Sequence, residues 1–369
     1  MKEKFQLRNV YNFMVVRRLA NRIKNEYLEF DDNGFCNSIN SNISNLNFGE
    51  RSELIKKNLE KFLPNDFEKA ANILVKSLEP ELSIEPGKTD WNRFIIIPLS
   101  EFISENGLEY YDLSMNSLYE MTKRFSSENA IRPFIKKYPD KTLKLLKEWA
   151  KDENVHVRRL VSEGTRTRLP LCSRLEDYRK DPKPIINLLE LLKDDQEQYV
   201  RRSVANNLND ISKDNPKIII KTLKRWKKDA SKERFWIINH ALRTLFKNGN
   251  IDALELMDFT KPNISNTKID LDKENIKIGE NMIIQIEFLS KYNQLLMIDY
   301  IIHFIKSNGK HSEKVFKLTV KTCKKDQLIK IRKKHSFKQM TTRKHYPGIH
   351  IIQLLINGHR YNKQEFMLE

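Results

Sequence analysis

Two similar helical segments recur along this chain at a fixed spacing, and this repeat constrains the architecture more than any other feature. HVRRLVSEG at 156–164 is echoed by YVRRSVANN at 199–207, an offset of 43 residues that aligns Val157 with Val200. A weaker copy, RFWIINHALRTL at 234–245, follows at a shorter offset. In each copy the apolar residues are three or four positions apart, which places them on one face of an α-helix. A chain of this kind is expected to stack helical units on one another.

The spacing of the repeat indicates which kind of stack to expect. A period near 43 residues fits the helix pairs of HEAT or armadillo repeats, which span about 40 to 47 residues. Short polar turns at 181–184, 194–196 and 214–216 interrupt the helical pattern, and Asp or Asn near Pro is typical of a helix start. We therefore predict a mainly α chain in which residues 1–260 form a HEAT-like α-solenoid. Its concave surface would carry the arginines of the repeats.

The periodicity changes after Phe259, just before Pro262. KPNISNTKIDLDKENIKIGENMIIQIEFLS at 261–290 alternates apolar and polar residues, as a β-strand does. Asn357-Gly358 is a strong hairpin signal. Further candidate strands lie at 295–307, 314–323, 335–340 and 349–360. We predict that residues 261–369 form an immunoglobulin-like β-sandwich, although the Cys and Trp hallmarks of antibody domains are absent.

The charge of the chain favours a polyanionic partner. Lys and Arg number 67 against 49 Asp and Glu, which gives a formal net charge of +18. Ten of these cations fall between Lys321 and Lys344, where Asp326 is the single acidic residue. Such an excess indicates nucleic acid first and an anionic membrane surface second.

Several other classes of protein fit the sequence poorly. The three cysteines are too few for a disulfide framework and too far apart for a zinc cluster, so we expect reduced thiols. His156, His240 and His335 have no metal-ligand spacing, and no Gly-rich phosphate loop is present. We expect neither metal nor cofactor. No apolar run approaches the roughly 20 residues of a membrane span, and the N-terminus does not resemble a signal peptide. The sequence predicts a cytoplasmic monomer, at the bacterial nucleoid, without a membrane partner.

Four longer motifs in a characteristic order resemble a known family. They are FSSENAIRPFI at 125–135, VRRLVSEGTRTRLP at 157–170, YVRRSVANNLNDISKDNP at 199–216 and SKERFWIINHALRTL at 231–245. Together they resemble the AlkC-type alkylpurine DNA glycosylases. IDYIIHFIKSNGK at 298–310 and KKHSFKQMTTRKHYPGIH at 333–350 look like the immunoglobulin-like extension of that family. The resemblance covers most of the chain and is weakest over its first hundred residues.

The resemblance implies an enzyme that cleaves the N-glycosidic bond of 3-methyladenine, and of 3-methylcytosine as a further substrate, in alkylated double-stranded DNA. Methylation at N3 makes the base cationic and a good leaving group, so the enzyme mainly has to stabilise an oxocarbenium-like sugar and position a water. By resemblance, the catalytic carboxylates are Glu128, Glu163 and Asp210. Glu163 and Asp210 would face the sugar and the water, and Glu128 would contact the lesion or the same water. The family also implies a lesion handled without a full base flip, unlike most glycosylases.

Each of these carboxylates also has a structural interpretation. Glu163 is near a helix end and could pair with Arg166 or Arg168 as an ordinary ion pair. Asp210 could cap a helix or remain solvated. Glu128 follows two serines and could belong to a capping box.

The predicted DNA contacts come from both parts of the chain. They are Arg158, Arg159, Arg166, Arg168, Arg201, Arg202, Arg234, Trp236, Arg243, Lys333, Lys334, Arg343 and Lys344. Adjacent arginines cannot share one orientation on a helix, so one of each Arg-Arg pair is expected to bridge neighbouring repeats.

The aromatic residues divide between the core and the lesion. Trp149 and Trp226 are expected in the core, whereas Trp236 could stack near the lesion. Leu171 stands where the family pattern commonly has tryptophan, which puts stacking on a cationic base, and so the substrate range, in doubt.

Two alternatives from other classes remain open. The first is a noncatalytic HEAT-repeat protein that binds DNA or acts as a scaffold, and the three carboxylates argue against it. The second is a protein-interaction solenoid with an adhesion-like sandwich, which the charge of +18 disfavours. Release of free 3-methyladenine from methylated DNA would separate all three, because only an enzyme liberates the base.

Overall fold

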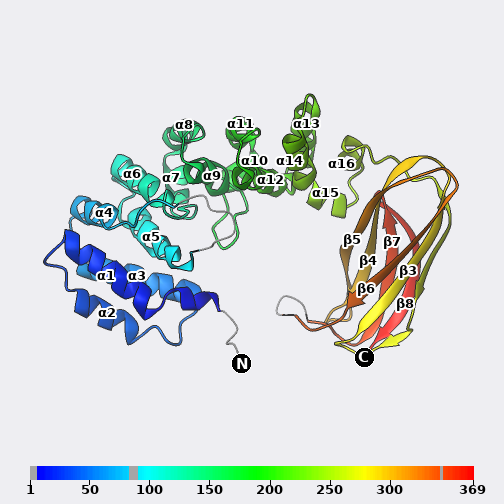
Figure 1. Cartoon of the computed structure of the whole chain (residues 1–369), viewed down its shortest axis with the longest axis horizontal. Coiled ribbons are helices and arrows are strands. Elements are labelled where there is room, and N and C mark those ends of the chain that lie inside the picture. The colour runs from blue at the N-terminus through cyan, green and yellow to red at the C-terminus, as the bar shows by residue number, and fades with distance from the viewer. Residues whose placement is uncertain (1–5, 83–89, 341–343) are drawn as a thin grey trace. The chain divides into compact units, whose positions relative to one another are not determined.

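The computed structural model describes residues 6–82, 90–340 and 344–369, with helices in the first two thirds of the chain and strands in the last third (Figure 1). The first helical elements are η1 (Leu7–Val10), α1 (Phe13–Glu26), α2 (Asp32–Asn40), α3 (Phe48–Phe62), α4 (Phe67–Lys76), η2 (Trp91–Ile95), α5 (Ile96–Asn106), α6 (Tyr111–Thr122), α7 (Arg132–Lys137) and α8 (Pro139–Trp149). They are followed by α9 (Val155–Gly164), α10 (Glu176–Lys180), α11 (Lys183–Leu192), α12 (Gln198–Ser212), α13 (Pro216–Lys227), α14 (Lys232–Ala241), α15 (Arg243–Lys247) and α16 (Ile251–Leu256).

The chain divides into two compact units. The first consists of residues 1–215 and 230–241, and the second of residues 216–229 and 242–369. Helices α13, α15 and α16 therefore group with the strands. Within the second unit, the Lys227 ammonium of α13 donates to the Leu256 carbonyl at the end of α16 at 2.7 Å. Helical and β structure thus share one compact unit at the end of the chain.

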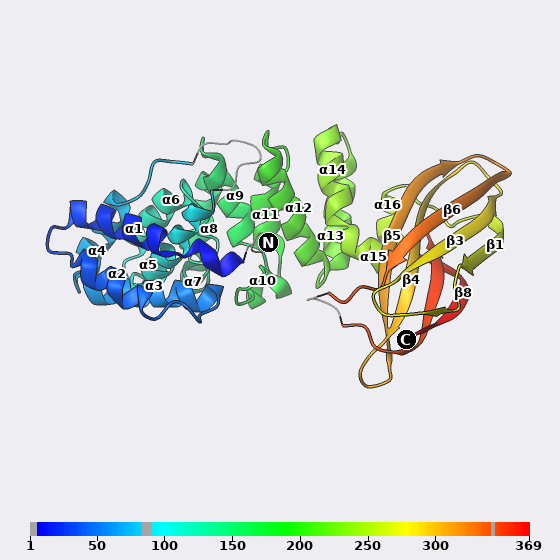
Figure 2. The same ribbon diagram turned by 60° about the horizontal axis from the view of Figure 1, so that its bottom comes forward.

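In the first unit, the helices that carry the first two copies of the sequence repeat lie side by side. Helix α12 packs against α9 and against α14, while α11 packs against α8 and α9 (Figure 2). The aligned residues Val157 and Val200 are both fully buried, as the repeat predicts. Asn154 caps α9 by accepting a hydrogen bond from the His156 amide, which ends the preceding turn and starts the helix. The repeat thus brings the C-terminal turns of α9 and α12 into one layer.

The weaker third copy of the repeat is not one continuous helix. Helix α14 ends at Ala241 and α15 begins at Arg243, so the segment 234–245 contains a break. Trp149, which was expected in the core of this unit, is 8% exposed. Trp226 of α13, in the second unit, is 1% exposed and is also a core residue.

The second unit contains two sheets with the predicted immunoglobulin-like character. Strands β1 (Ile264–Leu271), β3 (Asn281–Ser290) and β6 (Gln327–Ser336) form one sheet in the order β1-β3-β6. The other sheet has the order β2-β8-β7-β4-β5, from β2 (Asn275–Ile276), β4 (Gln294–Ile305), β5 (His311–Cys323), β7 (Gly348–Ile356) and β8 (His359–Leu368). Asn357 and Gly358 have φ of 43° and 78° and form the hairpin turn between β7 and β8, as predicted.

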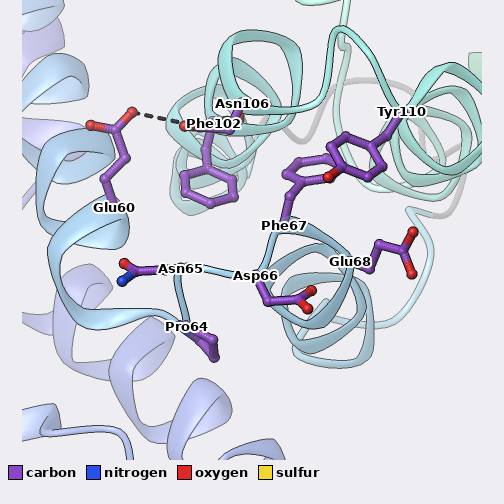
Figure 3. A pocket seen from close by; sticks show the side chains of 9 residues that line it. All are labelled: Glu60, Pro64, Asn65, Asp66, Phe67, Glu68, Phe102, Asn106 and Tyr110. Atoms are coloured by element: carbon purple, nitrogen blue, oxygen red, sulfur yellow. Dashed lines mark hydrogen bonds between the residues drawn. The ribbon is translucent and has the colours of Figure 1, made fainter.

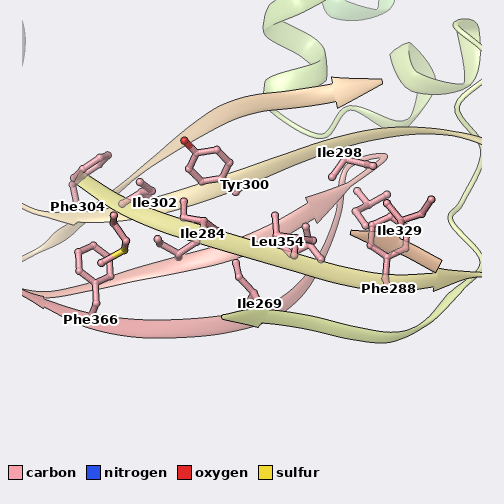
Figure 4. Close-up of a cluster of buried hydrophobic side chains, with 14 of the residues drawn as sticks. Ile269, Ile284, Phe288, Ile298, Tyr300, Ile302, Phe304, Ile329, Leu354 and Phe366 are labelled. Carbon is pink, nitrogen blue, oxygen red and sulfur yellow. The ribbon is translucent and has the colours of Figure 1, made fainter. Parts of the chain in front are cut away.

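Apolar side chains from both sheets fill the space between them (Figure 4). Ile284 and Phe288 of β3 face Ile298 and Ile302 of β4 across this core.

Among the residues that the structure describes, no helix combines the length and the apolar character needed to cross a bilayer.

A buried histidine is expected to make the stability of this sandwich depend on pH. The His335 side chain is held by the Tyr300 hydroxyl, 2.7 Å from its Nδ1, and burial together with His345 and Lys333 lowers the pKa of His335 to about 4. The unfolded chain binds a proton near pH 6.5, so we expect the free energy of unfolding to fall as pH decreases from about 6.5 to about 4. His335→Gln should make this dependence less steep in thermal unfolding, with a remainder from His303 and His350, whose pKa values burial also lowers, and exposed His311→Gln should not change it. An equally steep dependence in His335→Gln would show that other groups cause it.

Candidate active site

Two of the three predicted catalytic carboxylates lie on the packed helices α9 and α12. Glu163 is in the last turn of α9 and Asp210 is in the last turn of α12. They are 5% and 2% exposed, respectively. Both side chains are therefore buried, not solvated surface residues. Asp210 lies within α12, so it is neither the helix cap nor the solvated carboxylate that its structural interpretation offered. Buried carboxylates of this kind require partners.

One guanidinium holds both of these carboxylates. Arg166, which follows the end of α9, donates from Nη1 to Glu163 Oε1 at 2.6 Å and from Nε to Asp210 Oδ2 at 2.7 Å. Its Nη2 also lies 2.7 Å from Asp210 Oδ2. The structural pairing of Glu163 with Arg166 that the sequence suggested is therefore present, and it includes Asp210.

The third carboxylate joins the same network through a second arginine. Glu128 lies in the turn between α6 and α7, where its Oε2 accepts from Arg159 Nη1 at 3.0 Å. Arg159 Nη2 also lies 3.8 Å from Glu163 Oε2. The Arg159 guanidinium rests over the Tyr199 ring, 4.8 Å from its centroid. Residues distant in sequence thus converge on one charged cluster, which we call the carboxylate cluster: Glu128, Glu163, Asp210, Arg159 and Arg166.

The partners of the cluster keep Glu163 ionised. Burial alone would raise the pKa of Glu163, but Arg159, Arg166 and the Ser203 hydroxyl together hold that pKa below its usual value. Ser203 donates to Glu163 Oε2 at 2.5 Å. The Lys213 ammonium donates to Asp210 Oδ1 at 2.8 Å. An ionised carboxylate in a largely dry site can stabilise a nearby positive charge far more strongly than one in water.

Tyr199, Ser203 and Lys213 also contact the cluster and were not predicted from the sequence. Helical spacing could have found two of them, since Tyr199, Ser203 and Asp210 recur at intervals of four and seven residues, which places them on one face of α12. Lys213 lies three residues beyond Asp210, one helical turn away.

A fully buried arginine anchors the loop that carries Arg166. Arg132 of α7 is 2% exposed, and its guanidinium donates to the carbonyls of Gly164, Arg166 and Ser173 at 2.9, 2.9 and 2.7 Å. These three acceptors lie at the start and at the end of the segment between α9 and α10. Arg132 therefore fixes the backbone from which Arg166 reaches the carboxylates.

The same segment exposes an apolar side chain. Leu171 is 97% exposed and has a φ of 63°, a backbone conformation that L-residues other than Asn and Asp seldom adopt. No residue of this unit that the structure describes covers it. The Leu171 side chain therefore points away from the core.

Most of the arginines predicted to contact DNA are paired within the protein. Arg158 forms a fork with the Asp195 carboxylate at 2.7 and 3.2 Å, and Arg201 donates to the Asp195 carbonyl at 2.7 Å. Arg168 pairs with Asp214 at 2.6 Å, and Arg234 pairs with Asp194. Arg158 thus links α9 to the turn before α12, whereas Arg201 bonds to that same turn, immediately before its own helix.

The remaining predicted DNA contacts differ in exposure. Arg202 on α12 is exposed, and so are Lys333 and Lys334 on β6 and Lys344 beyond it. The Trp236 ring stacks on His240 with centroids 4.9 Å apart, and Arg243 is half-buried and engaged within the protein. Arg343 lies outside the described residues.

A hollow elsewhere in the first unit holds none of the predicted residues. It has a volume of about 600 Å³ and lies between α3, α4 and α5, where Glu60, Asp66, Phe67, Phe102 and Tyr110 line it (Figure 3). Within the described ranges, no group of three His, Cys, Asp or Glu side chains could hold a metal ion.

Comparison with known proteins connects this geometry to two families of domains. A family model described as a DNA alkylation repair enzyme matches residues 124–245, which include the whole carboxylate cluster. A model described as the C-terminal Ig-like domain of the uncharacterised protein YhaZ matches residues 265–369. YhaZ of Bacillus subtilis (strain 168) is 33% identical over 364 residues, which cover 98% of this chain and 99% of YhaZ.

A solved structure matches along the full length. It is the alkylpurine DNA glycosylase AlkC of Pseudomonas fluorescens, bound to DNA containing an abasic site analogue. The TM-score is 0.90 at 32% sequence identity, over 99% of this chain and 100% of AlkC.

Proposed function

The chain belongs to the AlkC-type family of DNA alkylation repair enzymes, and on that premise we propose that it is a DNA glycosylase for N3-methylated bases. Its main substrate would be 3-methyladenine in alkylated double-stranded DNA, with 3-methylcytosine as a second substrate. The observation that carries this proposal is the meeting of Glu128 with the buried Glu163 and Asp210 in one charged cluster, within the segment that the repair-enzyme model matches.

The proposed chemistry needs few catalytic groups because the lesion is already activated. An N3-methylated base is cationic in the duplex and leaves as a neutral molecule, so its departure transfers positive charge to the deoxyribose. Ionised carboxylates near C1′ stabilise that charge, and one of them can orient the attacking water. Glu163 and Asp210 would face the sugar and the water. Glu128, which is the most exposed of the three, would contact the lesion or the same water.

We further propose that residues 1–260 form a HEAT-like α-solenoid that holds the duplex, followed by the immunoglobulin-like domain at 261–369. The layered packing of α8 and α9, of α11 and α12, and of α12 with α14 supports the first part. The protein would act as a monomer. Phosphate contacts would come first from exposed cations such as Arg202, Lys333, Lys334 and Lys344, whereas Arg158, Arg159, Arg168, Arg201 and Arg234 already have carboxylate or carbonyl partners.

Release of free base tests this function directly. Duplex DNA treated with an N3-methylating agent should yield free 3-methyladenine and an abasic site when incubated with the full chain, as measured by chromatography of the released bases. Binding to methylated DNA without release of base would instead support the noncatalytic DNA-binding alternative. If the protein did not bind DNA, methylated or undamaged, the protein-interaction alternative would remain.

The salt dependence of DNA binding tests the contribution of the second unit. Each phosphate contact contributes about 0.9 to the slope of log affinity against log salt, so replacing both Lys333 and Lys334 by Gln should reduce the slope by about 0.9 if one of them contacts a phosphate and by about 1.8 if both do. These residues alternate along β6 and face opposite sides of the strand, so a reduction near 0.9 would assign the contact to one side. Lys268→Gln with Lys273→Gln removes the same charge from residues paired with Asp270 and Glu280 and should leave the slope unchanged. An unaltered slope in the first double variant would exclude phosphate contacts there.

A further inference from the structure

We propose that Arg166 is a positioning residue, which holds Glu163 and Asp210 side by side for excision and does not bind a DNA phosphate. This inference rests on the proposed glycosylase function. It also replaces the DNA-binding role that the sequence suggested for Arg166.

The hydrogen bonds of Arg166 leave little for a phosphate. All three of its side-chain nitrogens are within 2.7 Å of a carboxylate oxygen of Glu163 or Asp210. The side chain is 11% exposed, compared with 26% for the neighbouring Arg168. A phosphate could approach this guanidinium only by displacing a carboxylate from it. Arginine suits the bridging role because its planar, permanently charged fork can bind two carboxylates at fixed angles.

Neither Arg159 nor Lys213 contacts both carboxylates this closely. Arg159 lies 3.8 Å from Glu163 and reaches Glu128 but not Asp210, and Lys213 reaches Asp210 alone. Without Arg166, two buried carboxylates from α9 and α12 would face each other across an unfilled space. Like charges in such a site disfavour joint ionisation, so the pair would bind a proton more readily than it does with Arg166 in place, although Lys213 would still contact Asp210 and Arg159 would still lie near Glu163. Arg166 therefore acts on the spacing of the pair and on its charge.

Two substitutions separate these effects. Arg166→Gln removes the positive charge. We expect its single-turnover rate of 3-methyladenine release at pH 7 to fall at least about 10²-fold. We also expect the acidic limb of its pH-rate profile to move to higher pH, by about one pH unit or more. Arg166→Lys keeps the charge but cannot hold both carboxylates with a planar fork. We expect it to retain the position of the acidic limb and still lose rate.

The matched control is Arg179→Gln. Arg179 pairs with Asp214 and Glu176 and touches neither Glu163 nor Asp210, so its removal deletes a comparable guanidinium next to α12. The excision rate of this variant should stay within a factor of two of the rate of the unsubstituted protein at each pH. Affinity for undamaged duplex DNA should be the same in Arg166→Gln and in this control. A selective loss of affinity in Arg166→Gln, with an unchanged rate at saturating protein and an unchanged pH profile, would overturn the proposal and assign Arg166 to a phosphate.

A measurement without DNA keeps the proposal testable even if the unsubstituted protein releases no base. In Arg166→Gln the folded state would bind a proton more tightly than the unfolded state. The melting temperature of this variant relative to Arg179→Gln should therefore decrease as pH rises from about 4 to about 7. A difference that does not vary with pH would show that Arg166 does not control the ionisation of this pair. Absence of base release from the unsubstituted protein would count against the glycosylase function alone.

Discussion

Asp210→Asn is expected to lower the single-turnover rate of 3-methyladenine release by about 10²-fold or more, which corresponds to roughly 3 kcal/mol of lost stabilisation in the transition state. The amide has nearly the same shape as the carboxylate and can still accept a hydrogen bond from Arg166. What disappears is the negative charge that would face the developing sugar cation. The rate should be measured with protein in excess over methylated duplex, so that product release does not limit it.

Asp152→Asn provides the control for this substitution. Asp152 is also partly buried in the first unit, where it accepts hydrogen bonds from the Tyr119 hydroxyl and the Asn154 amide and touches no member of the carboxylate cluster. Its variant should excise the base at the unsubstituted rate. If Asp210→Asn also retains that rate, Asp210 is a structural residue and its assigned role is wrong.

Arg132→Met is expected to cause the largest loss of stability, about 3 to 5 kcal/mol in the free energy of unfolding. The side chains have similar lengths, but methionine cannot donate to the three carbonyls that Arg132 now satisfies. Each buried carbonyl that loses its partner costs about 1 to 3 kcal/mol, partly offset because burial of the charge itself is unfavourable. Denaturant unfolding followed by far-ultraviolet circular dichroism measures the change.

Exposed Arg174 lies in the same segment between α9 and α10 and supplies the comparison. Arg174→Met should alter the free energy of unfolding by less than about 0.5 kcal/mol. If Arg132→Met were as stable as Arg174→Met, the three carbonyls would have found other partners, and Arg132 would not be the anchor of this loop.

Periodicity alone was sufficient to predict much of the secondary structure. The alignment of Val157 with Val200 identified two helices that pack on each other, and Asn357-Gly358 identified the hairpin between β7 and β8. The candidate strand at 335–340 was placed too late, because β6 ends at Ser336. Its apolar alternation lies earlier, at Ile329 and Ile331, amid basic residues that obscured it. The grouping of α13, α15 and α16 with the sheets could not be predicted, since it depends on contacts between segments distant in sequence.

The candidate site was harder to predict than the fold. Motif resemblance singled out Glu128, Glu163 and Asp210, but it could not show that Arg166 lies between two of them. That arrangement depends on the packing of α9 against α12, which brings residues 44 positions apart within 2.7 Å. An arginine in a basic chain is readily interpreted as a phosphate ligand, and only its contacts distinguish a bridge between carboxylates from a free cation. The same holds for Arg158, whose partner Asp195 is 37 positions away.

The affinity for a charged mimic of the sugar tests most directly whether the carboxylate cluster stabilises positive charge on deoxyribose. Two otherwise identical duplexes would carry either a pyrrolidinium analogue of the abasic sugar, which is cationic, or a neutral tetrahydrofuran analogue. We expect the protein to bind the cationic duplex at least about tenfold more tightly, because transition-state mimics exploit the interactions that accelerate the reaction. Glu163→Gln combined with Asp210→Asn should abolish that preference. Equal affinity of the unsubstituted protein for the two duplexes would contradict the role assigned to these carboxylates.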